Sequence, residues 1–231
     1  MVPHLEAALA ELRAASVSGK GDEMAAYHKV DRVYLGTSNP EIDRLVKAWR
    51  AEITLDARLA LAAELWTTDI HEARIAAAKL LTQARIRPDD AAAWALIASW
   101  VPDFDAWAIA DHAAIAGQKR LVWNPDRLDD VEPWTRSDRL WTRRAALVMT
   151  LPWARLRNPK PADRAIRERI LGWAAACTAD PEWFIQKSVA WWLRDLSKKD
   201  PERVRIFLEA HGSEMKPFAY REAARHLPAE S

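Results

Sequence analysis

Four segments of the chain repeat one pattern, in which a basic residue is followed by small apolar residues and then by a large one. They read HEARIAAAKLL at 71–81, WTRRAALVMTL at 141–151, FIQKSVAWWLRDL at 184–196 and YREAARHL at 220–227. Their basic residues are separated by 70, 43 and 34 residues, and the first interval is about two units long; these residues are Arg74, Arg144, Lys187 and Arg221. Self-similarity at such a period is typical of solenoid proteins, whose repeats bury their apolar faces only by stacking on their neighbours.

The stretch DFDAWAIADHAA, residues 103–114, supplies the missing unit. Asp111 divides the first interval into 37 and 33 residues, and it takes the position that the other segments give to a cation. Units of this length, each built of two helices, predict an all-α, HEAT-like helical-repeat solenoid, an α-α superhelix that curves around a concave surface. We expect one repeat domain over residues 1–231.

Helices are also favoured by composition, because the chain has only 6 Gly while Ala and Leu are abundant. Proline follows Ser-Asn, Asp180 and Asp200 at segment edges, where an acceptor caps the first turn and Pro occupies an early helical position. No alternating β-branched run interrupts the pattern. The helices are expected near 3–16, 22–34, 40–51, 56–66, 69–84, 89–100, 103–117, 119–131, 137–151, 161–177, 181–197, 201–210 and 216–227.

Positive charge gathers in the middle of the chain. From 116 to 170, Lys and Arg outnumber Asp and Glu by 13 to 7, although the net charge of the whole chain is +1. Most of these cations are Arg, whose planar guanidinium suits phosphate oxygens. Solvated outer helix faces would give the same count. The shared position of the four basic residues instead favours a concave basic cleft that binds a polyanion.

Aromatic residues accompany the charges at helical spacing. Trp107 precedes Asp111 by four residues, and Trp191 follows Lys187 by four, so each pair shares a helix face. Most of the 13 Trp are expected to be packing residues, including Trp192, which points about 100° away from Trp191. A single Asp on a helix is also commonly a partner in a surface salt bridge of small energetic value.

Several other classes of protein are excluded or disfavoured. No apolar run approaches the roughly 18 residues of a membrane span, and the start MVPHLEAALAELRAA carries charges where a signal peptide needs an apolar core. A cytoplasmic protein without a membrane partner is therefore expected. The single Cys177 allows no internal disulfide and is expected to be buried and reduced. The sequence contains no Ser-His-Asp arrangement, no phosphate loop and no metal motif. No metal or cofactor is therefore expected.

The chain resembles the DNA alkylation repair family, the AlkD-like DNA glycosylases built of HEAT-like repeats. The resemblance covers most of the chain in the family's order, and its most specific part is FIQK with the following Trp-Leu-Arg-Asp. It is carried by MAAYHKVDRVYLGTSNPEIDRLVKAW (24–49), ELWTTDIHEARIAAAKLL (64–81), WAIAD (107–111), LWTRRAAL (140–147), WFIQKSVAWWLRD (183–195) and YREAARH (220–226). The segment between Trp107 and Asp111 is less polar here than in other members.

The resemblance implies a site in which two Trp and one Asp contact the damaged nucleotide and an Arg supports them. The catalytic residues would be Asp111, Trp107 and Trp191, and the supporting Arg would be Arg144. The repeat register and the basic stretch add Arg143, Lys187 and Arg74 to Arg144 as the expected DNA-binding residues. With DNA as its partner, the protein is expected to be nucleoid-associated and monomeric. It further implies a monofunctional DNA glycosylase that excises cationic N3- or N7-alkylated purines, such as 3-methyladenine, 7-methylguanine and bulky adducts, from duplex DNA in base excision repair. The base would not be flipped into a pocket.

The chemistry agrees with these residue types. An alkylated purine carries positive charge and is a good leaving group, and its departure leaves an oxocarbenium-like sugar that a carboxylate can stabilise. Indole faces attract such cations. The alternative left open by the sequence is a non-catalytic HEAT-like protein that binds DNA or acts as a scaffold.

Overall fold

The computed structural model describes residues 4–228, and over this range the chain is helical, with no strand beyond isolated bridges at Ser16 with Thr37 and at Val33 with Ile70. The prediction of an all-α helical-repeat fold is confirmed. The chain divides into two compact units, one up to Trp123 and the other from Asn124 onward. The single domain expected from the sequence stays a prediction. None of the described helices has the length and apolar character needed to cross a membrane.

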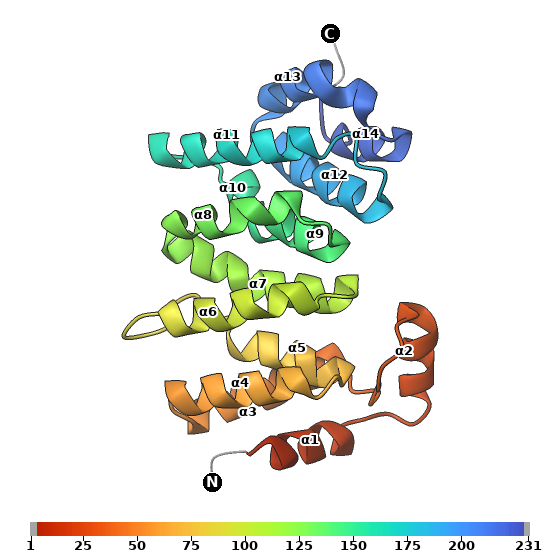
Figure 1. Cartoon of the computed structure of the whole chain (residues 1–231), viewed down its shortest axis with the longest axis vertical. Helices are drawn as coiled ribbons and strands as arrows, with labels where there is room; N and C mark the ends of the chain where they lie inside the picture. The colour runs from red at the N-terminus through yellow and green to blue at the C-terminus, as the bar shows by residue number, and fades with distance from the viewer. Residues whose placement is uncertain (1–3, 229–231) are drawn as a thin grey trace. The chain divides into compact units, whose positions relative to one another are not determined.

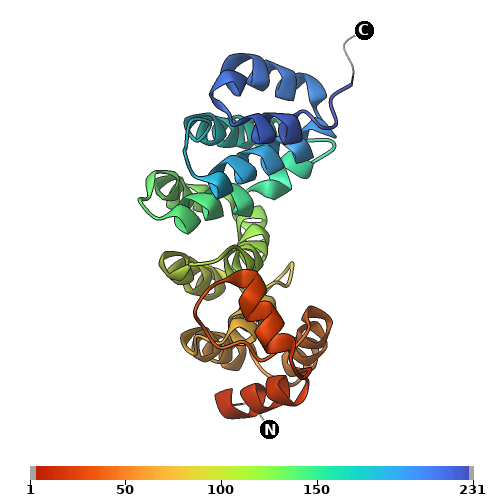
Figure 2. The same cartoon turned by 90° about the vertical axis from the view of Figure 1, so that its right-hand side faces the viewer.

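The first unit stacks helices in two layers. Helix α4 packs on α5 and α6 packs on α7, while α3, α5 and α7 contact one another in succession and form the inner row (Figure 1). Helix α2 lies beside these helices instead of within the stack, as both views show (Figures 1 and 2). The elements are α1 Leu5–Ala14, α2 Lys20–His28, α3 Asn39–Glu52, α4 Leu55–Thr67, α5 His71–Leu80, α6 Ala91–Trp100, the 3-10 turn η1 Val101–Asp103 and α7 Trp107–Trp123.

The second unit follows the same plan. Helices α9, α12 and α14 contact in succession as its inner row, and α10 and α13 pack against α12 (Figure 1). The elements are η2 Pro125–Arg127, α8 Leu128–Val131, η3 Glu132–Arg136, α9 Leu140–Met149, α10 Leu151–Arg155, α11 Pro161–Ala176, α12 Trp183–Ser197, α13 Pro201–His211, η4 Gly212–Glu214 and α14 Pro217–Ala223.

Most helix boundaries follow the predicted signals. Pro40 and Pro201 occupy the first turns of their helices, and the Asp200 side chain accepts a hydrogen bond from the backbone N–H of Arg203 at 3.2 Å. The signal at Asp180 and Pro181 is wrong by two residues, because α12 begins at Trp183 with Glu182 as its N-cap. As expected, Trp192 is fully buried, and Cys177 is a buried free cysteine.

Three predicted helices are wrong in their extent. The expected helices 103–117 and 119–131 are in fact one helix, α7, which runs to Trp123 and is followed by short helical turns. Gly117 in a helix interior costs only about 1 kcal/mol relative to Ala and does not end the helix; Asn124 and Pro125 do. The expected helix 22–34 ends at His28, because Lys29 has a left-handed φ of 57°.

Polar contacts between neighbouring repeats confirm the period independently of the sequence pattern. The Trp66 indole N–H donates to Asp103 over a separation of 37 residues, and Lys79 pairs with Asp43 over 36. In the second unit Thr178 donates to Glu214 over 36 residues. Contacts at one repeat length tie equivalent points of successive repeats together.

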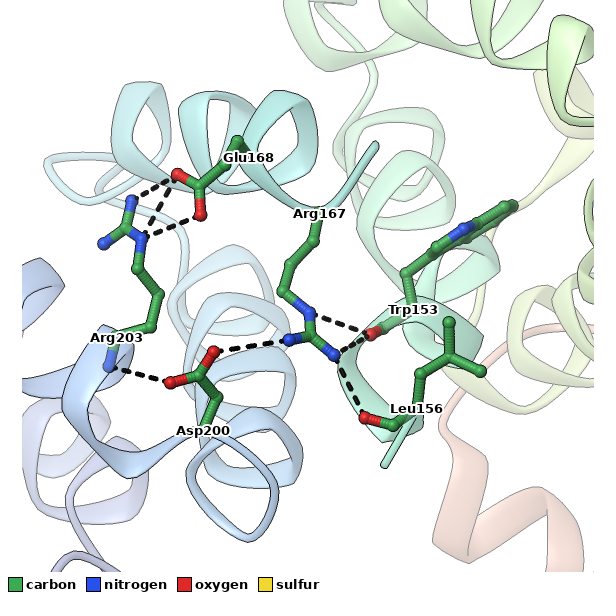
Figure 3. A network of polar contacts seen from close by, with 6 residues as sticks. All are labelled: Trp153, Leu156, Arg167, Glu168, Asp200 and Arg203. Atoms are coloured by element: carbon green, nitrogen blue, oxygen red, sulfur yellow. Dashed lines mark hydrogen bonds and ion pairs between the residues drawn. The ribbon is translucent and has the colours of Figure 1, made fainter. Parts of the chain in front are cut away.

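A buried Arg holds the outer layer of the second unit together (Figure 3). The Arg167 guanidinium, on α11, donates to the carbonyls of Trp153 and Leu156 at 3.1–3.2 Å, which lie at the end of α10. It also lies 3.4 Å from the Asp200 carboxylate, which caps α13. Arg203 in turn donates to Glu168 through two nitrogens. One side chain therefore satisfies the free carbonyls of one helix end and contacts the cap of another.

We expect Arg167→Met to lower the free energy of unfolding by about 3 kcal/mol, because the buried carbonyls of Trp153 and Leu156 lose their donors. Urea unfolding followed by circular dichroism measures the change. Arg164→Met is the matched control on the same helix, since Arg164 is exposed, and it should change stability by less than about 0.5 kcal/mol. Equal effects of the two substitutions would contradict this account of the network.

Candidate nucleic-acid interface

Four of the five repeated charged residues occupy the same position in their helices. Asp111 is the fifth residue of α7, Arg144 the fifth of α9, Lys187 the fifth of α12 and Arg221 the fifth of α14. Arg74 is the fourth residue of α5. The repeat alignment therefore identified one structural position, although the surroundings of these side chains differ.

In the first unit, Trp107 and Asp111 lie on α7, one helical turn apart, and both are half-buried. Trp107 is the first residue of the helix. The ring of His28, at the end of α2, lies 5.4 Å from the Trp107 ring, and Tyr27 approaches it edge-on at 6.1 Å. Sequence reasoning missed both residues, although the segment 24–49 contains them. Their signal is an aromatic pair that ends a helix just before an extended segment.

An aromatic cluster extends from this contact to the start of α5. The His28 ring lies 4.6 Å from the ring of His71, the first residue of α5, and Tyr34 lies 4.8 Å from His71. The end of α2 therefore packs against the first residues of two inner helices, His71 of α5 and Trp107 of α7. This packing fixes one side of the Trp107 indole.

The segment 29–37, which links α2 to α3, is tied to α5 by a buried carboxylate. Glu72, with 0% of its surface exposed, accepts hydrogen bonds from the backbone N–H groups of Leu35 at 2.9 Å and Gly36 at 2.8 Å. The N–H of His71 donates to the Val33 carbonyl at 2.9 Å. Gly36 has a φ of +86°, and a Cβ there would meet the Gly21 nitrogen at 2.8 Å, so this position requires glycine.

Arg32 adds a charged connection between three loops. Its guanidinium pairs with Asp69, which precedes α5, at 3.1 Å, and with Asp105, which precedes α7. The side chain of Arg32 is almost fully buried beneath these carboxylates. The loop that follows α2 is thereby joined to the loop that leads into Trp107.

The buried imidazoles of this unit are held neutral. Burial lowers the pKa of His71 to about 3, with the neighbouring His28 and Arg32 acting in the same direction. Burial also lowers the pKa of His28, and it lowers that of His112, beside Lys79 and Asp43, to about 4. The environment of Trp107 therefore gains no positive charge near neutral pH.

Stability should fall in acid because the unfolded chain binds protons that the folded unit excludes. Since the folded pKa of His71 lies below its ordinary value, its contribution is complete above about pH 6.5 and is lost as the pH falls toward 3. We expect His71 alone to decrease the free energy of unfolding by about 1.4 kcal/mol per pH unit between roughly pH 6 and pH 4. Urea unfolding across this range measures the slope.

The variant His71→Gln should reduce the dependence of the unfolding free energy on pH by the contribution of one proton, about 1.4 kcal/mol per pH unit. His226→Gln is the control, because His226 is exposed near the end of the described chain. A slope that stays the same in His71→Gln would show that this imidazole is not the group that titrates.

Arg74, the cation of the first unit, is engaged within the protein. Its guanidinium donates to the Trp66 carbonyl at 3.0 Å, lies 3.2 Å from Asp69 and stacks over the Trp66 ring at 5.2 Å. The side chain therefore braces the turn between α4 and α5.

In the second unit, Arg144 and Trp191 are brought together. Arg144 is 3% exposed, donates to the Phe184 carbonyl at 3.1 Å and lies 6.0 Å from the centre of the Trp191 ring. Arg155 lies 5.9 Å from the same ring and pairs with Asp195 at 2.8 Å. Trp191 is half-buried between two guanidinium groups, while the adjacent Trp192 belongs to the core.

The remaining two cations differ in accessibility. Arg143 donates to the Asp180 carboxylate at 3.0 Å and to the Ser137 carbonyl at 2.8 Å, so it connects α9 to the turn before α12. Lys187 is exposed, and its ammonium lies 4.6 Å from the centre of the Trp183 ring. Of the four DNA-binding residues expected from the sequence, Lys187 is the one that the structure exposes.

Each unit thus offers a partly exposed indole with charged groups beside it, a carboxylate in the first and guanidiniums in the second. Such surfaces suit a ligand that combines aromatic or sugar faces with phosphates. Among residues 4–228 no cluster of three or more His, Cys, Asp or Glu side chains could hold a metal ion. Fold and site together define a helical-repeat protein with charged side chains at one repeated position of its inner helices and with an indole one helical turn away on α7 and α12.

The model of the family described as DNA alkylation repair enzyme matches residues 8–227. The chain therefore belongs to the DNA alkylation repair enzyme family.

Solved structures share the fold. A predicted DNA alkylation repair enzyme from Enterococcus faecalis superposes with a TM-score of 0.76 at 20% identity, over 93% of this chain and 98% of that one. AlkD2 from Streptococcus mutans gives a TM-score of 0.63 at 21% identity, over 83% of this chain and 91% of that one. No curated protein sequence matches the chain.

Proposed function

We propose that the protein is a monofunctional DNA glycosylase that excises cationic N3- or N7-alkylated purines from duplex DNA, acting as a monomer. The observation that carries this proposal is the pair on α7, in which a half-buried carboxylate, Asp111, lies one turn after a half-buried indole, Trp107. Membership in the DNA alkylation repair enzyme family supports it. A carboxylate beside an aromatic face suits a substrate that becomes more cationic at its sugar as it reacts.

The reaction is heterolysis of the N-glycosidic bond. The bonding electron pair leaves with the alkylated base, whose positive charge it neutralises, and the positive charge moves to the sugar as an oxocarbenium-like species. Asp111 stabilises that charge by about 4 kcal/mol at roughly 4 Å and an effective dielectric near 20, before its own desolvation is subtracted. Water then attacks the anomeric carbon, and its proton passes to Asp111 or to solvent.

Each indole would contribute by attraction to positive charge on the substrate. Trp107 and Trp191 would each add about 0.5 to 2 kcal/mol through their π faces. The packing of His28 and Tyr27 on Trp107 holds the first indole in place, and Arg144 and Arg155 flank the second. Rigid side chains lose little entropy when the nucleotide binds.

The backbone of the duplex would be held by cations at the repeated position. Lys187 is exposed and suits direct contact with phosphate. Arg74, Arg143 and Arg144 already donate to carbonyls or carboxylates of the protein, so we assign them first to bracing the surface and second to the phosphates that pass near it. Binding through the backbone agrees with catalysis at the sugar without extrusion of the base.

Release of free base from DNA that contains 7-methylguanine tests the proposal. We expect the protein to release the base faster than the spontaneous rate measured without protein, and to do so without cutting the strand. Release at only the spontaneous rate, together with retained DNA binding, would establish the alternative of a non-catalytic DNA-binding protein.

Asp111→Asn should reduce the rate of base release at least about 100-fold, equivalent to about 2.7 kcal/mol, while DNA binding is kept. The substitution removes the negative charge and preserves the shape of the side chain. Asp56→Asn is the matched control, because Asp56 is an exposed carboxylate on α4, and it should release base at the parent rate. If Asp111→Asn also did so, the carboxylate would not be the catalytic group.

A further inference from the structure

Helices α7 and α12 begin in the same way. Trp107 and Trp183 are the first residues of their helices, and Asp111 and Lys187 are the fifth. The repeat therefore presents an indole one turn before a charged group twice, with a carboxylate in the first unit and an ammonium in the second. The sequence pattern predicts a DNA contact for Lys187 and assigns no role to Trp183.

Trp183 is a rigid, exposed aromatic residue. Its side chain is on the surface, with 46% of the residue exposed. The Phe218 ring stacks on it at 5.5 Å with an interplanar angle of 24°, and Phe184 meets it edge-on at 4.9 Å. These two contacts fix the indole while leaving part of it open to solvent. Exposing a large apolar ring costs free energy that burial against a ligand would recover.

The charges around Trp183 suit a polyanion. The Lys187 ammonium lies 4.6 Å from the centre of the ring, and among residues 4–228 no acidic side chain forms an ion pair with it. Arg221, at the same position of the neighbouring helix α14, is also exposed. A phosphate that approached Lys187 would therefore displace no carboxylate from it, and the adjoining helix α14 offers a further cation for the same backbone.

We propose that Trp183 and Lys187 form a DNA backbone contact, in which the indole packs on a deoxyribose and the ammonium pairs with an adjacent phosphate. The inference rests on DNA as the partner in the proposed function. A sugar is favoured over a stacked base, because the Phe218 ring already stacks on part of the indole, and a deoxyribose needs less open ring area than a base. Such a contact is independent of sequence, since every nucleotide carries the same sugar and phosphate.

Binding of an undamaged, fluorescently labelled duplex, measured at several salt concentrations, tests the two halves of the contact separately. Trp183→Leu should weaken binding about three- to ten-fold with an unchanged salt dependence, because the indole carries no charge. Lys187→Met should lower the slope of log affinity against log salt by about 0.9, the share of one phosphate contact. Arg164→Met, which removes an exposed cation from α11, is the control and should change neither quantity.

Competition with inorganic polyphosphate separates a sugar contact from simple attraction of charge. Polyphosphate should bind Trp183→Leu as well as it binds the parent and should bind Lys187→Met more weakly. The proposal is overturned if folded Trp183→Leu binds the duplex within two-fold of the parent, if the salt slope of Lys187→Met is unchanged, or if Trp183→Leu loses polyphosphate and duplex equally. Melting temperatures verify folding, and the exposed Lys187→Met decides the matter where Trp183→Leu does not fold.

Base release from 7-methylguanine DNA by the same proteins distinguishes this inference from the proposed function. If the parent protein binds DNA through Trp183 but releases no base, the backbone contact is supported and the proposed glycosylase activity is contradicted. If the parent releases base, and Trp183→Leu binds DNA and releases base as well as the parent does, the glycosylase activity is supported and the backbone contact is contradicted.

Discussion

The arrangement of the first unit depends on the buried carboxylate of Glu72. A charge removed from water is tolerated only when hydrogen bonds compensate it, and the N–H groups of Leu35 and Gly36 provide them. These bonds hold the segment 29–37 against the first turn of α5 and so place the end of α2 beside His71 and Trp107. The position of the candidate catalytic indole therefore follows from a carboxylate that never touches it.

Each unit places a partly exposed indole beside charged groups, and the sign of that charge differs between the units. Around Trp107 the imidazoles are neutral, because burial lowers the pKa of both His28 and His71, and the charged group one turn along is the Asp111 carboxylate. Around Trp191 the neighbours are the guanidiniums of Arg144 and Arg155. The two indoles therefore have neighbours of opposite charge.

Local signals predicted most of the helices, since Pro at first turns and the Asp200 cap act over a few residues. The period was also predictable, because one apolar pattern recurs wherever an inner helix must pack on its neighbours. The path of residues 29–37 was not predictable, because it depends on Glu72, which lies 36 residues beyond Gly36. The burial of the charged residues could not be predicted from the sequence either. Arg144 and Lys187 occupy the same helical position, yet the fold buries Arg144 against Phe184 and leaves Lys187 exposed. The pairing of Trp183 with Phe218 required two helices to be placed together.

The Arg167 network binds helix ends in the outer layer of the second unit through backbone carbonyls and caps, without using the inner position of any repeat (Figure 3). Backbone groups are present whatever the side chains are. The inner position can therefore change its chemistry while the framework stays constant, and this chain fills it with an acid, a buried guanidinium and an exposed ammonium. In a helical repeat of this kind the framework does not depend on which side chain stands at the repeated position. One substitution there can therefore add or remove a catalytic group without a change of fold.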